Sequence, residues 1–142
     1  MERPLPTIDD ETRPYWDAAR ERRLLLQRCT ACGHHVFYAR VLCPHCHRGP
    51  LEWVDASGGG EVYSFTVARR PASPAFAHLV PYVVALVDLD EGVRMLATLR
   101  VDDPEQAHVG QRVRVAFEEL GEMTLPVFTP APDDSPRSAA AA

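Results

Sequence analysis

The chain has 142 residues, a net charge of −5 and arginine at all 15 of its basic positions. This length fits one domain, or a small module of a larger protein. The acidic excess lies in the second half of the chain, which argues against duplex DNA or an anionic membrane surface as a partner.

Residues 1–27 form the first segment, in which we expect a helix from Asp10 onward with Asp9 or Asp10 as its N-cap. Trp16, Ala19 and Arg23 recur at the spacing of one helix face. The polar, acidic start is unlike a signal or transit peptide, and no run approaches the roughly 20 apolar residues that span a bilayer. We therefore expect a cytoplasmic protein with no membrane partner and with reduced thiols.

Residues 28–50 hold every cysteine of the chain, as two Cys-x-x-Cys pairs separated by ten residues. Each pair can present two thiolates from one tight turn, and four thiolates complete the tetrahedron that zinc prefers. The pattern therefore predicts a structural zinc site in a compact hairpin. Its predicted ligands are Cys29, Cys32, Cys43 and Cys46.

Three other kinds of chemistry use cysteine pairs of this type: an iron centre, thiol redox catalysis and disulfide bonds. A rubredoxin-like iron centre uses the same four ligands and stays open at this point. Thioredoxin-type chemistry needs a Cys-x-x-Cys at a helix start in a βαβ unit, and a reducing compartment disfavours disulfides. Four histidines lie beside the pairs, and we interpret them as solvated side chains: His34, His35, His45 and His47.

Residues 51–129 are predicted to form a small closed β-barrel, because strand-like runs follow one another with turn residues between them. The run Ser57 to Gly60 predicts a turn, after which Tyr63, Phe65 and Val67 should share one face. The later expected strands are Pro81–Asp90, buried on both faces, Val93–Val101, residues 112–119 and a short strand at 125–130. Residues 130–142 have the composition of a disordered tail.

The order of these parts resembles that of one known family. The segments PYWDAARERRLLLQRCTACG, CPHC, GGGEVYSFTV, PYVVALVDLDEGVRMLATL and VGQRVRVAFEE follow one another within residues 10–128. In this the chain is similar to the zinc-ribbon OB-fold proteins associated with acyl-CoA enzymes, known as domain of unknown function 35 (DUF35). The resemblance implies a mainly β fold with an N-terminal helix, a rubredoxin-like zinc ribbon and a five-stranded OB-fold barrel.

The resemblance also implies a function. Members of this family pair with thiolase-like enzymes that cleave, condense or transfer acyl-CoA thioesters, including retro-aldol cleavage in steroid side-chain degradation. We therefore expect a non-catalytic accessory subunit, in an α2β2 assembly whose thiolase-like partner supplies the catalytic residues. Some members are fused to hydratase domains, so the chain can also be a module of a longer protein.

The residues themselves offer no catalytic constellation. Ser57 and Ser64 lack a G-x-S-x-G context, and the acidic turn at Asp88, Asp90 and Glu91 is interpreted as turn chemistry. We expect acyl-CoA to bind at the partner interface, where guanidinium groups suit its phosphates as bidentate donors. The candidates for this CoA path are Arg69, Arg70 and Arg94, with Arg40 in the ribbon as a further one.

Two apolar regions are candidate partner contacts, namely the Trp16 face of the helix and the loop that carries Phe76, His78 and Tyr82. Two other functions are compared with the accessory role. Single-stranded nucleic-acid binding would use Tyr63, Phe65 and Tyr82 as stacking platforms, but the barrel half is acidic. A free-standing enzyme or electron carrier is the third hypothesis.

Overall fold

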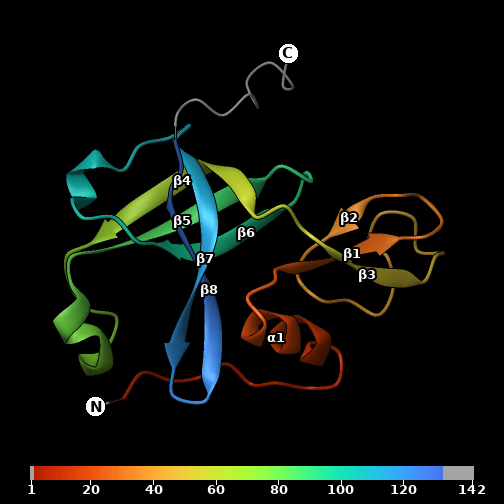
Figure 1. The fold of residues 1–142 in the computed structure, drawn as a ribbon, viewed down its shortest axis with the longest axis horizontal. Coiled ribbons are helices and arrows are strands. Elements are labelled where there is room, and N and C mark those ends of the chain that lie inside the picture. The colour runs from red at the N-terminus through yellow and green to blue at the C-terminus, as the bar shows by residue number, and fades with distance from the viewer. Residues whose placement is uncertain (1, 133–142) are drawn as a thin grey trace.

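The computed structural model describes residues 2–132, which form a three-stranded sheet and a closed five-stranded barrel joined by one short linker. In Figure 1 the small sheet lies to the right of the barrel, and the only α-helix of the described residues lies below and between them. The predicted tail falls mostly at residues 133–142, which lie outside the described part of the chain. The predicted mainly β fold, with its helix, ribbon and barrel, is confirmed.

Helix α1 spans Arg13–Arg20, a shorter range than the sequence predicted. A turn precedes it, in which the backbone N–H of Thr12 donates to Asp9 Oδ1 at 2.9 Å and that of Asp9 donates to Thr12 Oγ1 at 3.1 Å. The helix therefore begins after Thr12, with Pro14 in its first turn, where a missing N–H has no cost. Arg23 lies beyond its end and pairs with Asp55, so it is not part of the helix face.

The small sheet has the order β2-β1-β3, formed by β1 (Leu25–Cys29), β2 (His35–Val36) and β3 (Leu51–Asp55). β1 pairs with both neighbours in antiparallel register. The sequence assigned residues 51–55 to the barrel, whereas here they pair along the whole of β1. The ribbon sheet thus includes the strand that leads out of it toward the barrel.

The barrel has the strand order β4-β5-β6-β8-β7 and closes through a pairing of β4 with β7. Its strands are β4 (Gly59–Ala68), β5 (Tyr82–Leu89), β6 (Arg94–Leu99), β7 (Arg112–Leu120) and β8 (Met123–Pro130). Short 3-10 helices, Pro74–Leu79 and Pro104–Gln106, lie in the β4–β5 and β6–β7 connections. The seam between β6 and β8 is narrow, with the single pair Leu99 and Phe128 in parallel register.

Alternation along the strands places the barrel core, with two departures from the sequence prediction. A β-bulge between Val62 and Ser64 leaves Tyr63 unpaired, so Tyr63 is exposed while Phe65 and Val67 face the core. β5 was predicted to be buried on both faces. In the structure every second side chain of β5 is buried, and the side chains between them are half-buried. The most deeply buried apolar side chains of the barrel are Val62, Val83, Val87, Leu99, Val113 and Phe128.

Candidate functional site

The four cysteine thiols meet at one point beside the ribbon sheet. All four sulfur atoms lie within 4.8 Å of one another, with 3.6 Å between Cys29 and Cys46 and 3.7 Å between Cys32 and Cys43. A tetrahedral zinc ion with Zn–S bonds of about 2.3 Å requires sulfur–sulfur distances of about 3.8 Å. The donor set therefore fits zinc in number, chemistry and spacing.

Each Cys-x-x-Cys pair forms a tight turn that aims backbone N–H groups at sulfur. The N–H groups of Ala31 and Cys32 donate to Cys29 Sγ at 3.3 and 3.4 Å, and that of His45 donates to Cys43 Sγ at 3.3 Å. The residue after each pair has a positive φ, 80° at Gly33 and 59° at His47. The two turns are therefore alike, although glycine fills this position in only one of them.

Gly49 lies where any side chain would collide with the site. A Cβ atom there would lie 2.6 Å from Cys29 Sγ and 2.8 Å from the Ala31 Cβ. Both distances are shorter than carbon–sulfur and carbon–carbon contact allows. The chain therefore passes this close to the metal centre only because residue 49 is glycine.

Backbone donors also set the acidity of the thiols. The N–H groups of Arg48 and Gly49 lower the pKa of the Cys46 thiol to about 6, and the N–H of Cys32 lowers the pKa of Cys29. At Cys32 the N–H of His34 acts in the same direction, but desolvation and the neighbouring thiols outweigh it and raise the pKa to about 11. The backbone donors thus shift Cys29 and Cys46 toward the thiolate, the form in which cysteine binds zinc.

One of the four histidines has more than a solvated role. The Nδ1 atom of His34 lies 3.3 Å from Cys32 Sγ, and its ring stacks on that of His45 at 4.4 Å. His34, His45 and His47 are exposed and His35 is half-buried. The spacing of His34, two residues after Cys32, was the available signal for this contact.

Gln27 holds the loop between the two cysteine pairs, and sequence reasoning missed it. This buried amide donates from Nε2 to the backbone oxygen of Arg40 at 2.9 Å and accepts at Oε1 from the Arg40 N–H at 2.7 Å. Both polar groups of one loop residue are thereby satisfied by one side chain. No local pattern marks Gln27, because its partner lies 13 residues away.

The three arginines predicted for a CoA path do not lie together. Arg69 and Arg70 follow the end of β4, whereas Arg94 begins β6 and is level with Glu61 at the other end of β4. At about 3.3 Å per residue, this separation along the strand is roughly 20 Å. Arg94 pairs with Asp88 at 2.6 Å and stacks 3.4 Å above the Tyr63 ring, and Arg69 pairs with Glu105.

The acidic turn is occupied by structural contacts. Asp88 pairs with Arg94, Asp90 pairs with Arg112 at 2.9 Å, and Glu91 accepts from the backbone N–H of Ser57 at 2.7 Å. Within residues 2–132, the four cysteines are the only group that could hold a metal ion.

A stacking platform for bases does not form at the predicted aromatics. Phe65 packs against the barrel core, Tyr63 is covered by Arg94, and the Tyr82 ring lies 6.0 Å from that of Phe76. Exposed aromatic faces in a row are what single strands need. The three side chains therefore do not support nucleic-acid binding.

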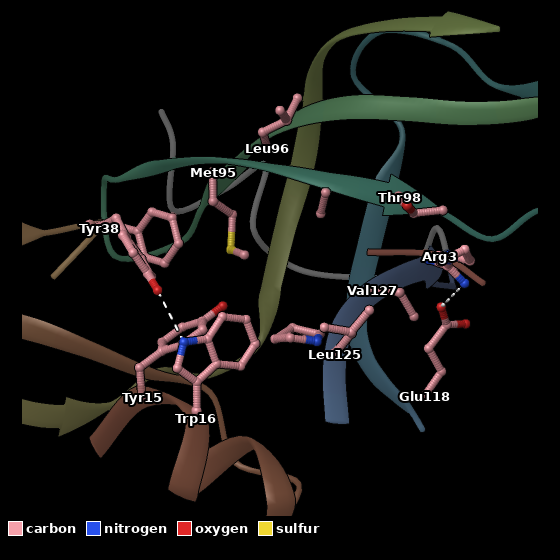
Figure 2. A pocket seen from close by; sticks show the side chains of 13 residues that line it. Arg3, Tyr15, Trp16, Tyr38, Met95, Leu96, Thr98, Glu118, Leu125 and Val127 are labelled. Carbon is pink, nitrogen blue, oxygen red and sulfur yellow. Dashed lines mark hydrogen bonds and ion pairs between the residues drawn. The ribbon is translucent and has the colours of Figure 1, made fainter. Parts of the chain in front are cut away.

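A pocket of about 270 Å³ opens at the barrel seam, where α1 and the ribbon loop meet β6 and β8 (Figure 2). Its walls combine apolar side chains, among them Tyr15 and Trp16 from the helix and Leu125 from β8, with the polar side chains of Arg3, Thr98 and Glu118. Trp16 Nε1 donates to the Tyr38 hydroxyl at 3.1 Å, which ties the helix to the ribbon loop. Trp16 is buried, so the predicted apolar contact face on the helix is covered within the chain.

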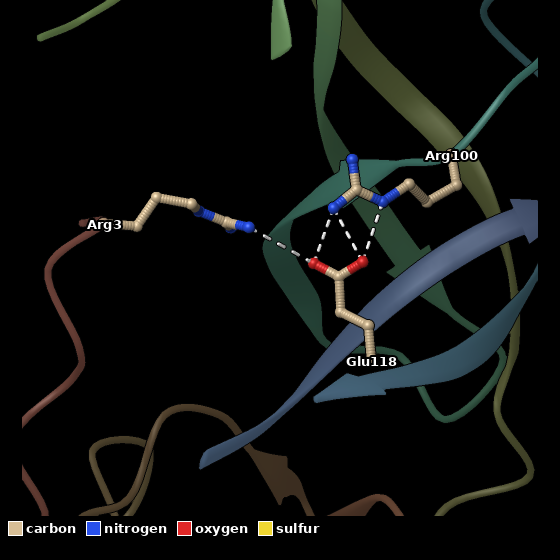
Figure 3. A network of polar contacts seen from close by, with 3 residues as sticks. All are labelled: Arg3, Arg100 and Glu118. Carbon is tan, nitrogen blue, oxygen red and sulfur yellow. Dashed lines mark hydrogen bonds and ion pairs between the residues drawn. The ribbon is translucent and has the colours of Figure 1, made fainter. Parts of the chain in front are cut away.

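A charged group closes the far end of this pocket. Glu118 on β7 is held by Arg100, whose Nε donates at 2.9 Å, and Arg3 approaches the same carboxylate at 3.7 Å (Figure 3). Arg3 also lies over the Phe76 ring, 5.5 Å from its centre. The N-terminal segment is thus fixed to both the barrel and the Phe76 loop.

No helix among the described residues is long and apolar enough to cross a membrane.

Two family models match the chain, each over one of its two parts. The rubredoxin-like zinc ribbon domain of ChsH2 matches residues 16–52, and the C-terminal OB-fold domain of ChsH2 matches residues 53–118. The first range includes all four cysteines. The predicted family resemblance and the predicted structural zinc are thereby confirmed.

Curated proteins from several organisms are similar to the chain. A DUF35 domain-containing scaffold protein of Methanothermobacter thermautotrophicus is 36% identical over 96 residues, 67% of this chain and 71% of that protein. A "Probable enoyl-CoA hydratase alpha subunit" of Thermomonospora curvata is 43% identical over 132 residues, 91% of this chain. The "3-oxo-4,17-pregnadiene-20-carboxyl-CoA hydratase alpha subunit" of Mycobacterium tuberculosis is 34% identical over 125 residues, 88% of this chain. The chain spans 40% and 39% of these two hydratase subunits.

A solved structure is similar over the whole folded part. The matching chain of the structure named "Ltp2-ChsH2(DUF35) aldolase" is 41% identical and superposes with a TM-score of 0.80. The match covers 90% of this chain and 100% of that one.

Proposed function

The chain belongs to the DUF35 family of zinc-ribbon OB-fold proteins, and from this we propose that it is a non-catalytic subunit that supports a thiolase-like enzyme acting on acyl-CoA thioesters. The similarity to the DUF35 chain of the Ltp2-ChsH2 aldolase, complete over that chain, is the observation that carries this proposal. Retro-aldol cleavage is the reaction we assign first, with condensation and acyl transfer as alternatives. The printed name of the M. tuberculosis relative, a pregnadiene carboxyl-CoA hydratase subunit, supports steroid side-chain degradation as the setting.

The polar contacts of the described residues support a structural role. Asp88, Asp90 and Glu118 are each paired with an arginine, and one oxygen of Glu91 accepts from the backbone N–H of Ser57, so these carboxylates already take part in contacts that hold the fold. We further propose that Cys29, Cys32, Cys43 and Cys46 bind the zinc ion. Four protein thiolates fill its coordination shell, so this zinc supplies stability and offers no site for substrate.

For acyl-CoA we propose that Arg69 and Arg70 contribute to a phosphate path at the partner interface. Both lie at one end of the barrel, and both are exposed. Arg94 would need a separate contact, because it lies at the opposite end and is paired with Asp88. The expected α2β2 assembly and the cytoplasmic location remain part of the proposal. So does the division into residues 1–27, 28–50, 51–129 and 130–142, except that residues 51–55 pair with β1 and belong to the ribbon sheet. The chain can also act as a module within a longer hydratase subunit, since it spans 40% of one such relative.

The test is a pull-down of the tagged full chain from its native host, with the bound proteins identified by mass and the tag alone as control. We expect a thiolase-like enzyme in near-equal amount. Assays of the purified complex on CoA thioesters then separate cleavage from condensation and transfer. Recovery of nucleic acid without any enzyme would contradict the proposal.

A further inference from the structure

The loop between the cysteine pairs presents apolar side chains to solvent. Val41 is 76% exposed, Leu42 50% and Tyr38 38%. Trp16, which the sequence offered as the apolar contact face, is only 8% exposed. These three apolar side chains remain in contact with water, so their exposed surface does not stabilise the fold of this chain. Exposed apolar patches of this kind mark interaction sites.

This exposure belongs to an ordered loop. Gln27 holds both backbone groups of Arg40, the residue directly before Val41. The Tyr38 ring packs edge-on against Tyr15 at 5.4 Å, and its hydroxyl accepts from Trp16. A loop that is fixed before binding loses little conformational entropy when a partner covers it.

The segment of the chain that carries these side chains has charge of one sign. No carboxylate occurs between Glu21 and Glu52, a stretch that includes the whole loop. Arg40 and Arg48 are exposed, and in residues 2–132 neither guanidinium group takes part in an ion pair. The segment that carries the exposed apolar side chains is therefore cationic, and a cationic segment complements a partner surface that carries carboxylates.

The seam pocket continues this surface onto the barrel. Tyr38 of the ribbon loop and Leu96 of β6, which is 65% exposed, both line this pocket and are labelled in Figure 2. Tyr15 and Trp16 add aromatic rings to the lining of the pocket, which has a volume of about 270 Å³. A large apolar side chain that protrudes from a partner would be desolvated there, as interface anchors are.

We propose that Tyr38, Arg40, Val41, Leu42, Arg48 and Leu96 form one docking surface, the ribbon-loop surface, for the thiolase-like subunit. This inference rests on the proposed function. The complementary surface of that subunit carries a protruding apolar side chain, which enters the seam pocket, and carboxylates that face Arg40 and Arg48. The ribbon, and not the loop at Phe76, is then the main contact region of this chain.

The experiment measures the affinity of the enzyme recovered in the pull-down for the zinc-loaded full chain, by calorimetry at low and high salt. We expect the double variant Val41→Asp, Leu42→Asp to raise the dissociation constant by about 100-fold or more. We expect the double variant Arg40→Glu, Arg48→Glu to raise the dissociation constant by about 10-fold and to make binding less dependent on salt. The matched control is Val109→Asp. Val109 is 65% exposed, between the values of Leu42 and Val41, but it lies in the connection between β6 and β7, so this variant should bind like the wild type.

Zinc content and circular dichroism establish that each variant is folded, and Val41→Ser with Leu42→Ser gives a milder form of the apolar change. Equal affinity of the wild type and all ribbon variants would overturn the docking surface and leave the proposed function intact. A wild type that binds no thiolase-like enzyme would overturn both. Wild-type self-association that the Val41 and Leu42 changes abolish, without any effect on enzyme binding, would assign the surface to a second copy of this chain and overturn the inference.

Discussion

The ribbon and the barrel are stable for different physical reasons. The barrel buries a continuous set of aliphatic and aromatic side chains from all five strands, with Val87, Val113 and Phe128 completely inaccessible. Between Thr30 and Pro50, where every residue is described, Val36 is the only buried aliphatic side chain. β2 in this stretch has two residues, too few to hold a sheet by hydrogen bonds alone. The part of the ribbon between Thr30 and Pro50 therefore depends on the metal, whereas β1 shares the apolar core of the barrel through Leu26.

This difference links stability to assembly. An apolar core must face inward, and the large apolar side chains that the barrel leaves exposed, Tyr63, Leu96 and Val109, lie on separate segments of the chain. A metal centre releases the ribbon from that requirement, and its loop can direct Val41 and Leu42 outward without loss of order. If the ribbon-loop surface binds the enzyme, then zinc controls assembly through the ribbon while the barrel remains folded.

Removal of zinc should produce the largest effect and should separate the two regions. Structural zinc contributes about 10–16 kcal/mol in small zinc-binding peptides, which is more than the ribbon can replace from its own contacts. We expect a strong chelator, or Cys43→Ser, to abolish amide protection in residues 29–50 and to leave the protection of β4 to β8 largely unchanged. Hydrogen exchange read by mass spectrometry measures both regions at once.

Zinc added back to the chelated wild type is the control and should restore the ribbon signal. Loss of protection across the barrel as well would mean that the two regions unfold as one unit. Retained ribbon protection without metal would contradict its metal dependence.

A second prediction tests the barrel and not the metal centre, by removing a side chain from the barrel core. Phe128 is fully buried on β8 and forms the one residue pair that joins β8 to β6. We expect Phe128→Ala to lower the free energy of unfolding by about 3–5 kcal/mol, since it leaves a cavity that the seam cannot close. Leu96→Ala on the neighbouring strand is the control, and it should change the stability by less than about 0.5 kcal/mol, because Leu96 is largely exposed.

Urea unfolding followed by far-ultraviolet circular dichroism, which is dominated by the barrel strands, measures both variants. Similar losses for Phe128→Ala and Leu96→Ala would show that burial at the seam does not determine barrel stability.

In both the ribbon and the barrel, some features could be predicted from the sequence and others could not. The metal centre could be predicted from spacing alone, because two Cys-x-x-Cys pairs allow few other arrangements. The strands expected at residues 93–101 and 112–119 likewise correspond to β6 and β7, where Met95, Leu99 and Val113 are buried. Both predictions depend on contacts that repeat locally along the chain.

What the sequence did not predict depends on partners that are distant in the chain. Residues 51–55 have the pattern of a barrel strand, and only their pairing with β1 places them in the ribbon. The bulge that exposes Tyr63 adds one residue to β4, and no residue pattern marks it. The Gln27 contact with Arg40 and the burial of Trp16 under Tyr38 likewise arise from packing between segments.

A smaller effect is expected where the chain passes closest to the metal. A methyl group at residue 49 would contact Cys29 Sγ at 2.6 Å, so Gly49→Ala must displace either the sulfur or the backbone. We expect zinc affinity to fall by about 10–100-fold, as it does when the surroundings of metal ligands are disturbed. Competition with a colorimetric chelator measures this affinity.

Gly92→Ala provides the control, because residue 92 has a φ of 93° with open space around it. It should reduce stability through backbone strain alone and leave zinc affinity unchanged. Equal zinc affinity in Gly49→Ala and the wild type would mean that the loop relaxes without a cost to the site.

The smallest expected effect is a gain in stability. It is expected at residue 47, where the turn of the second cysteine pair has histidine and the turn of the first has glycine. His47 has a φ of 59°, a conformation that is unfavourable for a residue with a Cβ atom, whereas Gly33 fills the equivalent position of the first turn. We expect His47→Gly to relieve this strain and to raise the stability of the zinc-bound ribbon by up to about 1 kcal/mol, measured as slower amide exchange in residues 43–49. His45→Gly is the comparison: His45 lies two residues earlier without a positive φ, so glycine there adds entropy to the unfolded chain, removes the stack with His34 and should lower stability by about 0.5–1 kcal/mol. Equal losses in the two variants would indicate that the left-handed conformation at His47 has no cost, and that the two cysteine turns are equally relaxed despite their different residues.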